Sequence, residues 1–121
     1  GAAALLWLVA CRGDIDQGSI RIVSMKKELS RVNDQALCEG FTLTSKEVKA
    51  YFTRAGEVDE NRFAHEAVIF SCRYSGTLRA GGTTQSWAIY PGGAGYLYDG
   101  HKINKRFLCE GSCCIALRSV C

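Results

Sequence analysis

The sequence is poor in the patterns on which several common functions depend. Its longest apolar run covers nine residues, whereas a membrane-spanning helix needs about 20. Its net charge of +3 is small and the basic residues are dispersed, so the chain lacks the concentrated basic face of a nucleic-acid-binding protein. We find no internal repeat and no low-complexity segment. These absences argue against a nucleic-acid partner and against a membrane-spanning helix.

Motifs of hydrolases and nucleotide-binding proteins are also missing. The only histidines are His65 and His101, and the position four residues after His65, where a zinc-protease helix carries its second histidine, is Ile69. No G-x-S-x-G elbow is present. The glycine-rich segment 90–96 lacks the Lys-Ser/Thr of a phosphate loop, so we interpret it as a turn. We predict a protein that is not an enzyme, with no catalytic residue, no cofactor and no bound metal.

Cysteine is abundant by contrast. The chain has 121 residues, 47% of them hydrophobic and 22% charged, which is typical of one globular domain with a modest core. Seven cysteines are rarely tolerated in a reducing cytosol unless they bind metal or react, whereas in an oxidising compartment they form disulfides. These cysteines are Cys11, Cys38, Cys72, Cys109, Cys113, Cys114 and Cys121.

The N-terminus explains why the cysteine count is odd. Residues 2–10 read AAALLWLVA, the length of the apolar part of a secretory signal peptide. The end of this run together with the following cysteine, Leu8-Val9-Ala10-Cys11, resembles the lipobox of bacterial lipoproteins. The resemblance covers about eleven residues and implies cleavage before Cys11 and lipidation of that cysteine. The glycines and scattered charges that follow indicate a lipidated tether over residues 11–25, in which Ile20, Ile22 and Val23 could form a short strand. We predict a single domain over residues 26–121.

The same resemblance implies a location. In enterobacterial lipoproteins an Asp after the lipidated cysteine favours retention in the inner membrane, whereas this chain has Arg12. We therefore expect the periplasmic side of the outer membrane. Two alternatives remain open: residues 2–10 form a buried helix or strand, or translation starts at Met25 and the six later cysteines stay in the cytosol.

Helical patterns occupy the first part of the predicted domain. Leu29, Val32, Ala36 and Leu37 lie near helical spacing, which predicts a helix over residues 26–38. A capping-box pattern, Thr44 with Glu47, opens a second helix. Its apolar stripe runs at i, i+3, i+4 and i+7 over residues 48–55, before Gly56 ends it.

The pattern then changes to that of strands. Alternation over residues 68–74 predicts one strand, and further strands are predicted over 83–90, 95–98 and 103–109, with turn residues between them. Residues 57–62 read as a polar connection. We predict an α+β fold in which two N-terminal helices pack on a small antiparallel β-meander stabilised by disulfides.

Six cysteines allow 15 pairings, which the sequence does not resolve. A bond between Cys38, at the end of the first helix, and Cys72, in a strand, would join helix to sheet. Cys113 and Cys114 are adjacent, so we expect them to have different partners. A zinc site at Cys109, Cys113, Cys114 and Cys121, with His101 nearby, is the rival interpretation, although only the first pair has zinc-ligand spacing.

Aromatic residues concentrate in the predicted meander. We predict a partner-binding surface at Trp87, Tyr90, Tyr96 and Tyr98, because Tyr and Trp are enriched where proteins bind each other. Packing in the core explains them equally well, and Trp87 and Tyr90 have opposite strand parity. The leading hypothesis is an inhibitor or immunity-type lipoprotein that neutralises an enzyme attacking the cell envelope. The alternatives are a structural subunit of an envelope or secretion assembly, and a small enzyme or zinc-binding protein.

Overall fold

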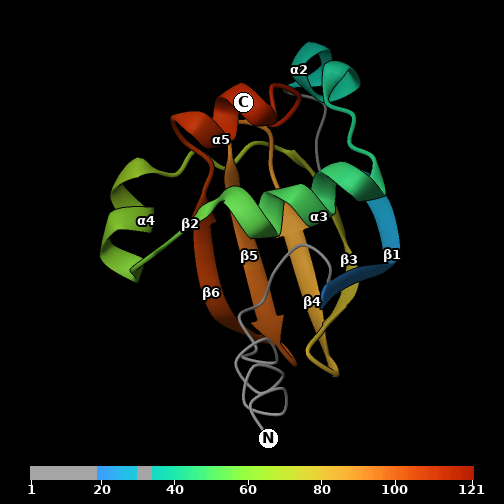
Figure 1. The fold of residues 1–121 in the computed structure, drawn as a ribbon. Helices are drawn as coiled ribbons and strands as arrows, with labels where there is room; N and C mark the ends of the chain where they lie inside the picture. Colours follow the sequence, from blue (N-terminus) through green and yellow to red (C-terminus); the bar gives the residue numbers. More distant parts are fainter. Residues whose placement is uncertain (1–18, 30–33) are drawn as a thin grey trace, which may run out of the picture.

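The computed structural model describes residues 19–29 and 34–121, which form an α+β fold around one antiparallel sheet (Figure 1). The sheet has six strands in the order β1-β3-β4-β5-β6-β2. The strands are β1 (Ile20–Leu29), β2 (Gly56–Val58), β3 (Cys72–Ala80), β4 (Thr83–Ile89), β5 (Ala94–Asp99) and β6 (Lys102–Leu108). The helices are α2 (Gln35–Gly40), α3 (Ser45–Arg54), α4 (Glu60–Glu66) and α5 (Ser112–Ala116).

The predicted meander is present as β3 to β6, with β1 and β2 added at its two edges. Three of its strands lie close to the predicted ranges. The first one begins at Cys72 rather than at residue 68, and Val68 and Ile69 are exposed in the loop before it. Residues 57–62, predicted as a connection, form β2 and the start of α4, whose first turn is capped by Asp59.

Helix α3 was predicted with its cap. The Thr44 hydroxyl accepts the Glu47 N–H, and the Glu47 carboxylate accepts the Thr44 N–H, so both halves of the capping box form. The helix lies across one face of the sheet (Figure 1) and buries Val48 and Tyr51 completely against it. The main core therefore lies between α3 and the strands.

The predicted helix over residues 26–38 is wrong. Residues 20–29 form the edge strand β1, which includes residues 20–25 of the segment assigned to the tether, and among the described residues of the predicted helix only 35–38 are helical, as part of α2. The register of β1 against β3 shifts between Ile22 and Ser24. Ile20 and Ile22, before this bulge, and Met25, after it, all pack on the core beneath α3. The bulge breaks the two-residue period that would have identified a strand.

Three disulfides cross-link the described residues, one between α2 and the sheet and two within the C-terminal tail. Cys38 of α2 bonds to Cys72 at the start of β3, one of the pairings that the sequence left open, and the Asp34 carboxylate accepts hydrogen bonds from the Ser71 N–H and hydroxyl beside it. Cys113 and Cys114 have different partners, as predicted. These bonds are Cys109–Cys113 and Cys114–Cys121.

Candidate binding surface on the open sheet face

The structure separates the four aromatic residues of the predicted binding surface. Trp87 lies under α3, with its ring 6.2 Å from that of Phe52, and only 1% of it is exposed. It therefore belongs to the core, and its predicted place in a binding surface is wrong. Tyr90, Tyr96 and Tyr98 lie on the opposite face of the sheet, where the Tyr96 ring is 6.1 Å from that of Tyr90 and 5.7 Å from that of Tyr98. Only 9% of Tyr90 is exposed and it packs in a second, smaller core cluster with Phe63, so its predicted place in a binding surface is wrong as well.

Strand pairing places these tyrosines among polar residues. Tyr98 is opposite Ser86, Tyr96 is opposite Ala88, and Ala88 is in turn opposite Ser75. Helix α4 covers one end of this face, where its Phe63 ring lies 4.9 Å from Tyr96. We call the part of this face that α4 leaves uncovered the open face. It lies on the side of the sheet away from α3 and includes Glu28, Arg73, Ser75 and Tyr98.

A charged network runs along the open face from β1 to Tyr90. The Arg73 guanidinium donates a hydrogen bond to the Glu28 carboxylate at 3.2 Å and another to the Tyr90 hydroxyl at 3.3 Å. The Ser75 hydroxyl donates to the same carboxylate, and the Lys26 ammonium lies 3.7 Å from it. Each group thus fixes its neighbour, so the open face presents its polar groups in a defined arrangement.

The surroundings of Glu28, Tyr96 and Tyr98 shift the pKa values of these three side chains. The Ser75 hydrogen bond, together with the charge of Arg73, lowers the pKa of Glu28 against the opposing effect of burial. Burial raises the pKa values of Tyr96 and Tyr98. At neutral pH Glu28 is therefore a carboxylate, and Tyr96 and Tyr98 are neutral phenols.

Two hollows lie on this network and share Glu28 and Arg73. One, of about 470 Å³, extends past Ser75 and Tyr98 to His101 in the turn between β5 and β6. The other, of about 290 Å³, is bounded by Tyr90 and by Leu29 and Ile69. Leu29 and Ile69 are 52% and 50% exposed. Apolar and aromatic groups thus border fixed charges, a combination typical of protein-binding surfaces.

The histidines, the acidic residues near α4 and the glycine-rich segment have ordinary structural roles in this fold. His65 lies on exposed α4 with its Nδ1 2.7 Å from the Asn61 carbonyl oxygen, and His101 is exposed in its turn. Among the acidic residues of this region, Asp59 caps α4, Glu66 pairs with Arg62, and Glu57 lies 3.7 Å from Lys105. Of the glycine-rich segment 90–96, which was predicted as a turn, residues 90–93 connect β4 to β5 and residues 94–96 already belong to β5.

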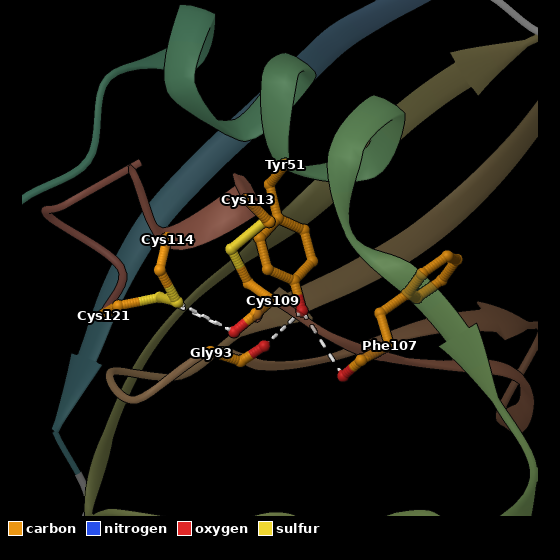
Figure 2. Close-up of a disulfide and its surroundings, with 7 residues drawn as sticks. All are labelled: Tyr51, Gly93, Phe107, Cys109, Cys113, Cys114 and Cys121. Carbon is orange, nitrogen blue, oxygen red and sulfur yellow. Dashed lines mark hydrogen bonds between the residues drawn. A yellow bond between two sulfur atoms is a disulfide. The ribbon is translucent and has the colours of Figure 1, made fainter. Parts of the chain in front are cut away.

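The rival zinc interpretation concerned the C-terminal cysteines, which form two disulfides in this structure. Sulfur atoms in disulfides are not thiolates, so this bonded state offers none of the ligands that zinc requires. Figure 2 shows the pair of bonds beside Tyr51, whose hydroxyl donates to the Gly93 carbonyl at 2.7 Å.

Cys11 and the lipobox lie outside the described residues. Within the described ranges, no helix is both long and apolar enough to cross a bilayer. Among the residues that line the candidate surface, sequence reasoning missed Glu28, Leu29, Ile69 and Arg73. Arg73 could have been identified from the sequence, because it lies in the alternating segment 68–74 that was predicted as a strand. No protein-family model, curated protein or solved structure matches this chain.

Proposed function

We propose that this protein is a lipid-anchored binding module of the bacterial envelope, of the inhibitor or immunity type. It faces the periplasm from the outer membrane, and its open face holds a protein, in this proposal an enzyme that attacks the envelope. The lipobox-like sequence ending at Cys11 supports the anchor, and three disulfides suit an oxidising compartment.

One observation carries the binding role. The open face joins Tyr96 and Tyr98 to a fixed Arg73–Glu28 pair and to the exposed side chains of Leu29 and Ile69. The buried Tyr90 hydroxyl accepts a hydrogen bond from Arg73 and so helps to fix that side chain. Tyrosine and arginine contribute strongly to binding because they combine a large contact area with directed hydrogen bonds. Cross-linking by disulfides keeps such a surface rigid, which reduces the entropy lost on association.

The anchor is tested by intact-mass spectrometry of the protein made from its full precursor in a bacterium. The expected product begins at Cys11, carries a diacyl- or triacylglyceryl group, and exposes six further thiols only after reduction. An unprocessed chain with free thiols would contradict the proposal.

Binding is tested with Tyr98→Ala as bait in affinity isolation from envelope extracts, beside the wild type. Lys46→Ala provides the control, because Lys46 is exposed on α3 at the opposite face. We expect one protein to be retained by the wild type and the control and lost from Tyr98→Ala, with an unchanged melting temperature showing that the domain remains folded. Equal retention by all three baits would contradict a role for the open face.

One observation favours the structural alternative, a subunit of an envelope assembly. Residues 20–25 extend the sheet as part of β1, a ten-residue strand paired on one side by β3 and placed at the edge of the sheet. Edge strands provide unpaired backbone groups to which a neighbouring strand adds. Light scattering separates the two functions, since the binding module is expected to be a monomer and a stacking subunit a concentration-dependent oligomer.

A further inference from the structure

The two C-terminal disulfides lie close enough together to exchange partners. The sulfur atoms of Cys109, Cys114 and Cys121 are all within 4.8 Å of one another, although Cys109 is bonded to Cys113 (Figure 2). The Cys114 sulfur also lies 3.1 Å from the Cys109 carbonyl oxygen, which places one bond directly against the other. A thiolate formed in either bond would therefore have a sulfur of the other within a short movement.

The two bonds differ in their access to solvent. Cys121 is exposed and Cys114 is half-buried, whereas Cys109 and Cys113 are 4% and 3% exposed. The Cys38–Cys72 bond is buried as well. Because a thiolate must reach a disulfide sulfur in order to attack it, the Cys114–Cys121 bond is the one open to an external thiol.

A hollow of about 320 Å³ lies over this accessible bond. It is lined by Cys114, Ile115, Arg118 and Cys121. The Arg118 guanidinium supplies a positive charge, which favours the thiolate form of an approaching thiol. Ile115, with 70% of its surface exposed, gives the hollow an apolar side. Because Cys114 is half-buried, a low-molecular-weight thiol reaches this bond more easily than a cysteine held in a folded protein.

We propose that the Cys114–Cys121 disulfide is an exchange site for a low-molecular-weight thiol, and that the exchange passes inward to Cys109. The external thiolate attacks the Cys121 sulfur, forming a mixed disulfide there, and Cys114 leaves as a thiolate. Cys114 then attacks the Cys109 sulfur, forming Cys109–Cys114, and Cys113 leaves and takes a proton from water. One external thiol is consumed and one internal thiol appears, so no oxidant or reductant is needed.

The fold can tolerate this rearrangement because the tail is also held without its disulfides. Leu117 and Val120 are buried in the core, and the Val120 carbonyl accepts the Gly92 N–H at 2.7 Å. Exchange therefore modifies Cys121 while α5 stays in place. This inference does not depend on the proposed binding role of the open face.

The test is incubation of the full chain with glutathione, followed by acid quenching, alkylation, trypsin digestion and mass spectrometry. Trypsin cleaves after Arg106 and Arg118, so residues 119–121 separate from residues 107–118 only when the Cys114–Cys121 bond is broken. We expect glutathione on Cys121, alkylation on Cys113, and a rate at Cys121 at least about tenfold above that at Cys38 or Cys72. Cys11 lies in a different peptide and is read separately.

Two controls distinguish the steps. In the double variant Cys109→Ser/Cys113→Ser, glutathione should still reach Cys121, but alkylation should move to Cys114 because its thiolate has no second disulfide to attack. In denaturant the preference for Cys121 should disappear, since the fold creates it. The proposal is overturned if the three disulfides of the folded chain react at similar rates, or if Cys114 is alkylated instead of Cys113 in the wild type.

Discussion

At the scale of single residues, the packing of α3 depends on one tyrosine and one glycine. Tyr51 is fully buried, its hydroxyl donates to the Gly93 carbonyl, and burial raises the pKa of its phenol. A Cβ atom added at Gly95 would lie 2.4 Å from the Tyr51 hydroxyl oxygen, closer than packed atoms can approach. Gly95 thus provides the space into which Tyr51 fits.

We therefore expect Gly95→Ala to lower the free energy of unfolding by about 1–3 kcal/mol, the usual cost of overpacking a core. Gly40→Ala is the matched control, because a Cβ atom there would have no neighbour within 4 Å. Urea unfolding measures both variants. Equal stabilities for the two variants would contradict the close fit of Tyr51 against β5.

Glu28 makes stability depend on pH. Its pKa is lowered in the folded state by the Ser75 hydrogen bond and by Arg73, so its contribution is present above the pKa of the unfolded chain and is lost as pH falls through the folded value. We expect Glu28→Gln to be less stable than the wild type at neutral pH, with the difference shrinking toward about pH 3. Ser75→Ala should weaken the same dependence. A difference that is constant with pH would show that the carboxylate is not responsible.

At the scale of elements, local signals determined how much the sequence could predict. The reciprocal cap of Thr44 and Glu47 and the apolar stripe of α3 are contained within one short segment, so this helix was predicted closely. The strands β4 to β6 were predicted from turn residues and alternation. Only the first residues of β1 were raised as a possible short strand, because the bulge breaks the alternation that would have identified the whole of it. Helix α4 was missed because only Phe63 of its seven residues is buried.

The candidate site was predicted only in part. The opposite parity of Trp87 and Tyr90 correctly placed them on different faces of the sheet. The sequence did not reveal which face α3 would cover, because both faces carry apolar residues and long-range packing decides between them. It also missed Glu28 and Leu29, since these residues reach the open face or its border only through the pairing of β1 with β3.

The close approach of β3 to the bulge in β1 predicts that Gly76 cannot be replaced without loss of stability. A Cβ atom at Gly76 would lie 2.0 Å from the backbone carbonyl oxygen of Ser24, and the Ser24 hydroxyl accepts the Thr77 N–H beside it. Gly76→Ala must displace backbone, so we expect a loss of more than about 2 kcal/mol in unfolding free energy. Gly56→Ala, where the nearest atom would lie at 3.9 Å, is the control. A loss no greater than that of Gly56→Ala would show that the two strands pair differently.

At the scale of the whole molecule, the disulfides differ in the length of chain that they close. Cys38 and Cys72 are 34 residues apart, whereas Cys114 and Cys121 are 7 apart. Chain entropy predicts a loss of about 4 kcal/mol for Cys38→Ala/Cys72→Ala and about 2.5 kcal/mol for Cys114→Ala/Cys121→Ala. Thermal and urea unfolding of the two double variants measures this ranking. The reverse order would indicate that the tail, rather than the link between α2 and the sheet, holds the domain together.

The molecule as a whole has two unlike faces. One is occupied by α3 and the main core, whereas the other keeps tyrosines, an ion pair and exposed apolar groups in reach of a partner. A soluble domain gains nothing in stability by leaving Leu29 and Ile69 half exposed beside that ion pair. We therefore propose that the open face is the surface that binds a partner.

The most direct test of that claim is site-specific photo-crosslinking in living cells. A photoreactive phenylalanine analogue replaces Tyr98 on the open face or, as the control, Lys46 on exposed α3. The account predicts that position 98 captures one envelope-associated protein and that position 46 does not. Capture of the same protein from position 46 but not from position 98 would place the binding surface on the other side of the molecule and contradict the account.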